Sequence, residues 1–135
     1  MALELAKDTI DIGIVTRDRK ASLAFYGGVL GLPALEELRM DGFTISRFQV
    51  GGCVLKILEF DRAPGVTGPG GALGDATGIR YWTVSVSNLD QILDACRAAG
   101  RPIADGPAQV RPGVTIALVE DPDGNLVEFV ERPAG

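Results

Sequence analysis

Apolar and polar residues alternate along the first part of the chain. Between residues 9 and 15, isoleucines occupy every second position, which is the pattern of a half-buried strand. The period lengthens after Asp18, a residue type that caps helix N-termini with its carboxylate. Three apolar side chains follow at the spacing of a buried helical stripe: Leu23, Tyr26 and Leu30. Gly31 ends this pattern, because glycine accepts the left-handed backbone that closes a helix. We predict a strand followed by a short helix.

Three further strands are predicted after this helix, at about residues 35–39, 43–50 and 53–60. The dipeptides Asp41-Gly42 and Gly51-Gly52 separate them, and both are typical of tight hairpin turns. The first part of the chain is therefore predicted to contain a strand, a helix and three antiparallel strands.

The second part of the chain repeats this order. A strand is predicted at residues 79–86, and Asn88 is a candidate helix cap. A helical stripe follows, formed by Leu89, Ile92, Leu93 and Cys96. Gly100 ends the stripe, and residues 114–120 and 126–131 are predicted to pair as a hairpin.

The two halves share these start and stop signals although their sequence identity is low. The cap candidates Asp18 and Asn88 are 70 residues apart, and the helix stops Gly31 and Gly100 are 69 residues apart. This regular spacing indicates an internal duplication of the architecture.

The segment between the halves, residues 61–78, contains six glycines and two prolines, so we predict a loop. It is longer than most connections, and it is either a tether between the halves or a flap over a site. We predict a single domain of residues 1–135, with module one at about 8–60, this linker, and module two at about 79–132.

Composition and charge exclude several classes of protein. A net charge of −5 and a pI of about 4.6 argue against nucleic-acid binding, because phosphates select basic surfaces. No apolar stretch approaches the roughly 18 residues of a membrane helix, and the N-terminus lacks the pattern of a secretion signal. We therefore expect a cytoplasmic protein. Cys53 and Cys96 have apolar neighbours and are expected to be buried thiols.

The chain contains no histidine. This excludes Ser-His and Cys-His nucleophilic catalysis, and it removes imidazole as a metal ligand or general base. Any chemistry must use carboxylates, Lys, Tyr, Ser, Thr, Cys or the backbone.

Three stretches of the chain resemble a known superfamily. The run from Asp18 to Leu32 is similar to the first-helix signature of glyoxalase, bleomycin-resistance and extradiol-dioxygenase proteins, the vicinal oxygen chelate superfamily. Asp121 to Phe129 resembles their C-terminal signature, and Gly78 to Asp90 the start of their second module. The resemblance implies an α+β fold of two tandem βαβββ modules, with curved mixed sheets that form a cleft and helices on the outer side. It does not identify the reaction, because the superfamily holds isomerases, epimerases, dioxygenases, thiol transferases and drug-binding proteins.

Metal-dependent members of that superfamily place a ligand, commonly His or Glu, in the first and last strand of each module. Counted from the helix caps, the matching positions here are Asp11, Lys56, Tyr81 and Glu128. Only Glu128 agrees with the family pattern. Lys56 would place a cation beside the metal, and a neutral tyrosine is a poor ligand. We therefore expect no metal ligands and no cofactor.

An ammonium group placed between the carboxylates could replace the charge of the ion. Burying Asp11 and Glu128 without compensation would be costly, so we hypothesise that Lys56 forms a salt bridge with one of them. Ordinary roles remain open: a solvated edge position for Asp11, a surface lysine on an edge strand, a structural Glu128, and a packing role for Tyr81 with its hydroxyl bonded to backbone. Trp82 has the opposite strand parity and is expected to pack under the helix.

Strand parity also predicts what surrounds these positions. Val54 and Leu58 share the face of Lys56, and Thr83 shares the face of Tyr81. The cleft is then mostly apolar with a few polar groups, as small-molecule sites usually are.

Three functions remain open at this point, and whether the protein is an enzyme is undecided. The first, slightly favoured, is metal-free binding of a small, partly apolar organic molecule; its ligand-binding residues would be Asp11, Lys56, Tyr81, Thr83, Glu128, Leu58 and Val54. The second is a metal-independent isomerase, cyclase or lyase; its acid–base groups would be Lys56, Tyr81, Glu128 and Asp11. The third is a divalent-metal-dependent lyase or dioxygenase with an altered ligand set.

The expected partners follow from the same features. We expect a small organic molecule and no nucleic acid or membrane, and the resemblance implies a two-fold homodimer. Arg47 and Arg80 are either groups that recognise a ligand carboxylate or solvent-facing strand arginines.

Overall fold

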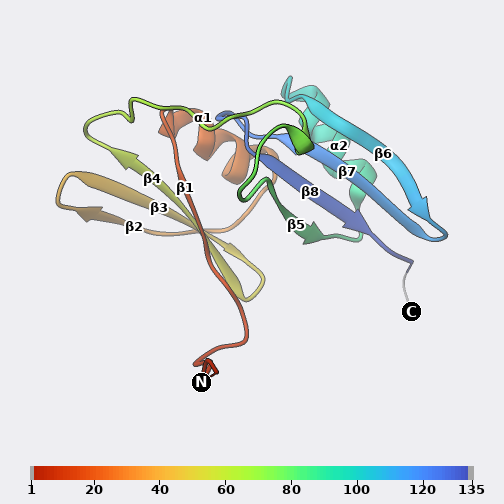
Figure 1. Ribbon diagram of the computed structural model, residues 1–135, viewed down its shortest axis with the longest axis horizontal. Coiled ribbons are helices and arrows are strands. Elements are labelled where there is room, and N and C mark those ends of the chain that lie inside the picture. Colours follow the sequence, from red (N-terminus) through yellow and green to blue (C-terminus); the bar gives the residue numbers. More distant parts are fainter. Residues whose placement is uncertain (1, 134–135) are drawn as a thin grey trace.

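The computed structural model describes residues 2–133, which form two four-stranded sheets (Figure 1). In the first sheet the order is β1-β4-β3-β2, with β1 parallel to β4 and the other neighbours antiparallel. Its strands are β1 (Ile12–Val15), β2 (Ala34–Met40), β3 (Phe43–Val50) and β4 (Cys53–Phe60).

The second sheet repeats this arrangement in the order β5-β8-β7-β6, again with one parallel pair, β5 and β8. Its strands are β5 (Tyr81–Ser85), β6 (Ile103–Arg111), β7 (Val114–Glu120) and β8 (Leu126–Glu131). The predicted fold of two tandem βαβββ modules is confirmed. The sequence pattern did not locate β6, because eight of its nine residues are exposed and leave no alternation to detect.

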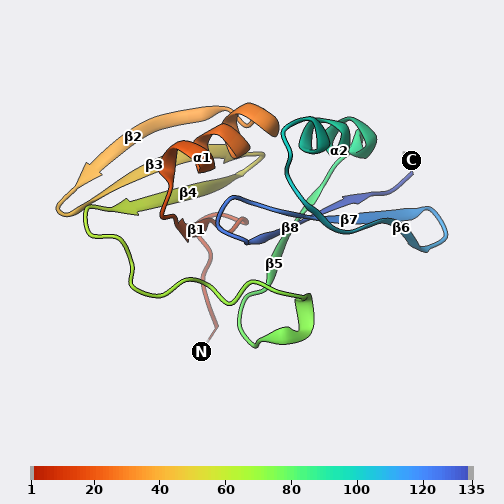
Figure 2. The same ribbon diagram turned by 90° about the horizontal axis from the view of Figure 1, so that it is seen from above.

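Helices cover one side of the sheets. In the first module α1 (Arg19–Leu23) continues directly into a π-helix, η1 (Ala24–Val29), and the second module contributes α2 (Leu89–Ala98). Figure 2 shows α1 and α2 on one side of the molecule and the long loop between β4 and β5 on the other. That loop contains a single 3-10 turn, η2 (Leu73–Asp75). Within residues 2–133, no helix has the length and apolar character needed to cross a bilayer.

The predicted helix caps have different outcomes. The Asp18 carboxylate accepts a hydrogen bond from the backbone N–H of Ala21 at 3.0 Å, as expected for a cap of α1. Asn88 occupies the N-cap position of α2, as predicted, but its side chain makes no capping hydrogen bond. The carboxylate of Glu131, on β8, accepts from the backbone N–H of Leu89 at 2.9 Å instead. The start of α2 is thus capped from the neighbouring sheet.

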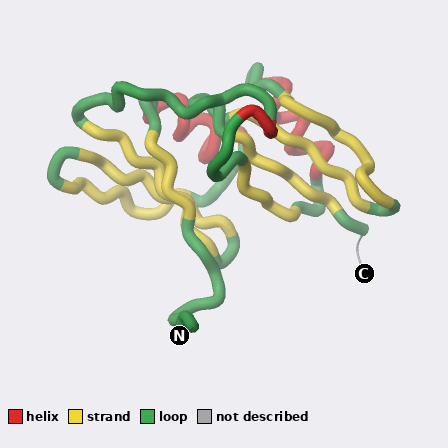
Figure 3. Tube along the Cα trace, viewed as in Figure 1, coloured by secondary structure: helices red, strands yellow, loops and turns green. Residues whose placement is uncertain are grey.

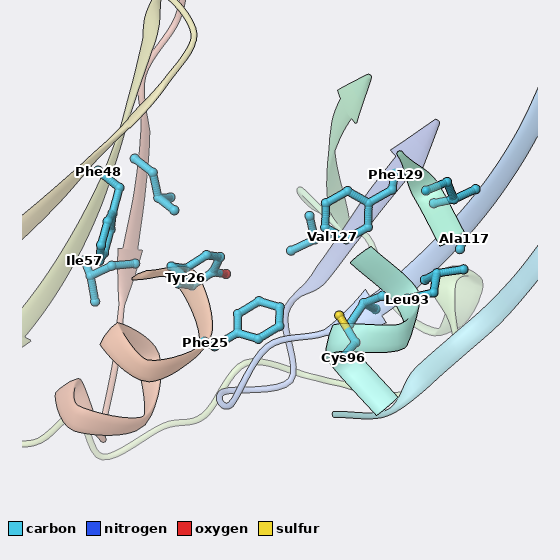
Figure 4. Packing of buried hydrophobic residues seen from close by; sticks show 12 residues of the cluster. Phe25, Tyr26, Phe48, Ile57, Leu93, Cys96, Ala117, Val127 and Phe129 are labelled. Carbon is cyan, nitrogen blue, oxygen red and sulfur yellow. The ribbon is translucent and has the colours of Figure 1, made fainter. Parts of the chain in front are cut away.

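A cluster of buried apolar side chains joins the two modules. Tyr26 and Phe25, both from η1, pack with ring centroids 4.8 Å apart. Figure 4 shows Tyr26 beside Phe48 of the first sheet, with Phe25 directed toward the second module. The Tyr26 ring also lies 6.3 Å from that of Trp82, which packs against this cluster, as predicted. The π-helix therefore places two adjacent aromatic rings between the sheets.

Hydrogen bonds from the turn between β7 and β8 add a second connection. Asp121 is 2% exposed, and its carboxylate accepts from the Tyr26 hydroxyl at 2.7 Å and from both the backbone and the side-chain amide of Asn125. Asp123 accepts from Thr16 Oγ1 at 2.6 Å and from Ser22 Oγ at 3.3 Å. The C-terminal turn of module two is thereby bound to the first strand and helix of module one.

Candidate functional site

A cavity of about 1140 Å³ lies between β1 and β5, the strands that flank the gap between the two sheets (Figure 1). We call it the β1/β5 cavity. Its walls include apolar side chains from both modules: Ile10, Ile12, Ile14, Val15, Val54, Trp82, Val84 and Leu126. A concave, largely apolar space of this size can hold a small organic molecule.

The loop between β4 and β5 forms another part of the wall. Four residues of this loop line the cavity: Pro64, Val66, Thr67 and Gly68. Figure 3 shows the loop crossing from one sheet to the other. The segment 61–78 therefore connects the modules, and part of it also contributes to the cavity wall.

Two arginines fix this loop. Arg17, just after β1, donates from Nη2 to the carbonyl oxygen of Pro64 at 2.7 Å. Arg80, just before β5, donates to three carbonyl oxygens: those of Gly70, Ala72 and Leu73. Both arginines also line the cavity.

Asp11 lines the cavity but has partners of its own. The ammonium of Lys7 lies 2.9 Å from one carboxylate oxygen, and the backbone N–H of Val54 donates to the other at 2.9 Å. The Lys7 hydrogen bond, followed by that from Val54, holds the pKa of Asp11 below its ordinary value.

The other predicted positions lie on the same side of the second sheet but do not meet Asp11. Thr83 Oγ1 donates to Glu128 Oε1 at 2.8 Å, across the parallel pair β5 and β8. Tyr81 is 43% exposed, and its hydroxyl has no hydrogen-bond partner in residues 2–133, so the alternative of a packing role with a bond to backbone does not hold. The hydroxyl is free to contact a bound molecule.

The hypothesis of a salt bridge from Lys56 is wrong. Four ion pairs occur in residues 2–133, and Lys56 is in none of them; Lys7 occupies the place beside Asp11. Register explains the difference, because β1 pairs Gly13, not Asp11, with Lys56. The lysine is displaced by two residues along the sheet.

The structure therefore divides the predicted ligand-binding residues into two groups. One group lines the β1/β5 cavity: Asp11, Val54, Tyr81 and Thr83. The other lies outside the lining: Lys56, Leu58 and Glu128. The neighbours of Lys56 on β4, Leu55 and Ile57, are buried in the core, so Lys56 points to the sheet face opposite the helices, as its parity predicted.

Sequence reasoning missed Arg17 and Asp123, and it left Arg80 undecided. All three line the cavity. Asp123 lies in the turn between β7 and β8, residues 121–125, and no sequence signal marked it as a cavity residue. For Arg17 the only signal was its position immediately after a strand.

Comparisons with known proteins agree with this architecture. The sequence model of the Glyoxalase/Bleomycin resistance protein/Dioxygenase superfamily matches residues 10–129. A glyoxylase/bleomycin resistance protein/dioxygenase domain from Frankia sp. is 20% identical, with a TM-score of 0.76 over 98% of this chain and 96% of that chain. A glyoxalase family protein from Bacillus cereus gives a TM-score of 0.84 over 99% of both chains, at 15% identity.

A glyoxalase I variant from Zea mays is also similar, with 18% identity, a TM-score of 0.74, and coverage of 92% of this chain and 44% of that chain. At these identities the likeness concerns the fold. No protein with a curated description matches the sequence.

Proposed function

Because the chain belongs to the Glyoxalase/Bleomycin resistance protein/Dioxygenase superfamily, we propose that it binds a small, partly apolar organic molecule in the β1/β5 cavity without a metal ion. The observation that carries this proposal is the lining of the cavity. Apolar residues of β1 and β5, Trp82 among them, form its walls, and Tyr81 and Thr83 add polar groups. Apolar walls supply affinity, and a few polar groups supply orientation.

The donor groups at the family's ligand positions do not fit a divalent cation. Asp11 is neutralised by Lys7, and Glu128 accepts from Thr83. Within residues 2–133, no group of three or more His, Cys, Asp or Glu side chains gathers closely enough to hold a metal. A divalent ion needs several anionic or strongly dipolar oxygen or nitrogen ligands, and the ammonium of Lys56 would oppose its charge.

The same geometry favours binding over metal-independent acid–base catalysis. A general acid or base must lie within hydrogen-bond reach of the substrate atom whose proton it moves, directly or through one water. Only two of the four candidate groups, Asp11 and Tyr81, line the β1/β5 cavity; Lys56 and Glu128 do not.

A cavity-filling variant tests the proposal. A Cβ added at Gly13, which lines the cavity, would meet no atom within 4 Å, so Gly13→Phe should fill the space without backbone strain. Gly28→Phe is the matched control, because Gly28 has equal room but lies on the exposed side of η1, away from the cavity. The probe is N-phenyl-1-naphthylamine, a neutral dye that fluoresces in apolar sites.

Trp82 is the chain's single tryptophan and lines the cavity, so energy transfer from it to the dye reports binding at this place. With protein treated with EDTA, we expect saturable energy transfer in the native chain and in Gly28→Phe, and its loss in Gly13→Phe. Equal binding by both variants, or binding only after a metal is added, would contradict the proposal.

A further inference from the structure

Two arginines in the cavity wall have no carboxylate partner. Arg17 and Arg80 both line the β1/β5 cavity. The ion pairs in residues 2–133 are Lys7–Asp11, Arg19–Glu37, Arg39–Asp61 and Arg97–Asp94. Neither cavity arginine belongs to this set. Arg17 is exposed and Arg80 is half-buried, so their charges are balanced only by solvent or by a bound molecule.

Each guanidinium is oriented by the loop but keeps hydrogen-bonding capacity. A guanidinium has five N–H donors. Arg80 uses Nε and Nη2 on carbonyl oxygens at 2.7 to 3.1 Å, and its Nη1 has no partner in the described chain. Arg17 uses only Nη2. Because carbonyl oxygens are neutral, these contacts hold the arginines in position without balancing their charge.

The carboxylates of the cavity wall are already engaged. Asp11 has the ammonium of Lys7. Asp123 accepts from the hydroxyls of Thr16 and Ser22 and from the backbone N–H of Arg17. Neither carboxylate is bonded to a cavity guanidinium, so free N–H donors of Arg17 and Arg80 remain available to a bound molecule, together with the Tyr81 hydroxyl.

We propose that the β1/β5 cavity takes an amphipathic organic anion, whose apolar body lies between β1 and β5 and whose carboxylate or similar head group binds Arg17 and Arg80. This inference rests on the proposed function and adds the charge and orientation of the ligand. The planar donor fork of arginine matches a carboxylate, and a charge-assisted bond is shorter and stronger than a neutral one. Because loop carbonyls already hold the two guanidinium groups, these groups are oriented before the ligand binds.

A pair of dyes with one aromatic body tests the inference. N-phenyl-1-naphthylamine is neutral, and 8-anilinonaphthalene-1-sulfonate adds a single anionic group. Energy transfer from Trp82 reports both at the same place. A hydrogen bond to a charged group is favourable by an amount equivalent to about a tenfold change in affinity or more, so we expect the native protein to prefer the sulfonate by at least about tenfold.

Variants assign this preference to the arginines. Arg80→Met and Arg17→Met should each lower the affinity for the sulfonate dye several-fold, and each should change the affinity for the neutral dye by no more than about twofold. Arg80→Lys keeps the charge and should retain part of the preference. Arg47→Met is the control, because Arg47 donates to the Glu36 carbonyl on the first sheet and does not line the cavity. Circular dichroism checks that each variant is folded.

The outcomes separate the two proposals. If both dyes bind equally, or if the preference for the sulfonate survives Arg17→Met and Arg80→Met together, the anion inference is wrong and the proposed function stands. If neither dye shows energy transfer from Trp82, both are wrong. If the methionine variants lose both dyes alike while remaining folded, the arginines act only as loop anchors and the inference is overturned.

Discussion

Replacing Tyr26 by phenylalanine removes one hydroxyl from the connection between the modules. Tyr26 is fully buried, and its hydroxyl donates to Asp121 Oδ2 at 2.7 Å. Burial, followed by the charge of Asp121, raises the pKa of this hydroxyl far above its ordinary range, so it remains a donor at any neutral pH. After Tyr26→Phe, the Asp121 carboxylate keeps its bonds to the turn but loses its donor from η1.

The magnitude follows from burial. A hydrogen bond to a charged group contributes about 1.5 to 3 kcal/mol, and water cannot replace the lost donor at a site that is 2% exposed. We therefore expect Tyr26→Phe to lower the free energy of unfolding by about 2 kcal/mol, or Tm by roughly 8 °C for a chain of this size. The loss should be constant across neutral pH, since the hydroxyl does not ionise there.

Urea denaturation followed by circular dichroism and by Trp82 fluorescence measures this change. The chain's other tyrosine supplies the control, because the 43% exposed Tyr81 has no hydroxyl partner in residues 2–133 and Tyr81→Phe should change stability by less than about 0.5 kcal/mol. A Tyr26→Phe protein as stable as the native one, or a loss of equal size from Tyr81→Phe, would refute the role given to the buried hydroxyl.

Three further predictions concern other parts of the molecule. The pKa of Asp11 lies below its ordinary value of 3.8, so the contacts of its carboxylate stabilise the fold above that pH, and this contribution is lost as pH falls through the lowered pKa. In Lys7→Met, NMR titration should find the titration midpoint of Asp11 at a higher pH. An unchanged midpoint would show that the ion pair does not lower this pKa. Gly106 has a φ of +78°, and a Cβ there would lie 2.5 Å from a backbone oxygen of β7, whereas Gly124 has a φ of +83° and free space around it. Gly106→Ala should therefore be less stable than Gly124→Ala by about 2 kcal/mol in thermal unfolding. Equal losses of stability in the two variants would show that the contact at Gly106 relaxes. The two-fold dimer implied by the family resemblance stays a prediction. Sedimentation velocity at micromolar concentration tests it, and a persistent 14.2 kDa species would contradict it.

Alternation and turn residues were enough to predict most of the architecture. The strands at β3 and β4 were predicted with their observed bounds, because Gly-containing dipeptides mark both ends of β3 and the start of β4. β6 was not located because exposed edge strands carry little periodicity. The π-helical form of η1 was also missed, since the spacing of Leu23, Tyr26 and Leu30 is compatible with an ordinary helix.

The candidate site was harder to predict, for reasons of register and pairing. Parity correctly predicted that Thr83 shares the face of Tyr81, and both line the cavity. Parity is unchanged by a shift of two residues, however, and that shift separates Asp11 from Lys56. The actual partner of Asp11, Lys7, precedes the strand and has no periodic signal. Arg80 could be recognised as a cavity residue only once the loop between β4 and β5 was seen to fold back over β5.

The central claim is that the β1/β5 cavity binds an organic molecule without a metal ion. Amide NMR shifts of EDTA-treated protein, titrated with N-phenyl-1-naphthylamine, test it most directly. We expect saturable shifts concentrated in Ile12–Val15 and Tyr81–Ser85, unchanged when zinc or manganese is added. Shifts confined to other parts of the chain, or shifts that arise only with the added metal, would contradict it.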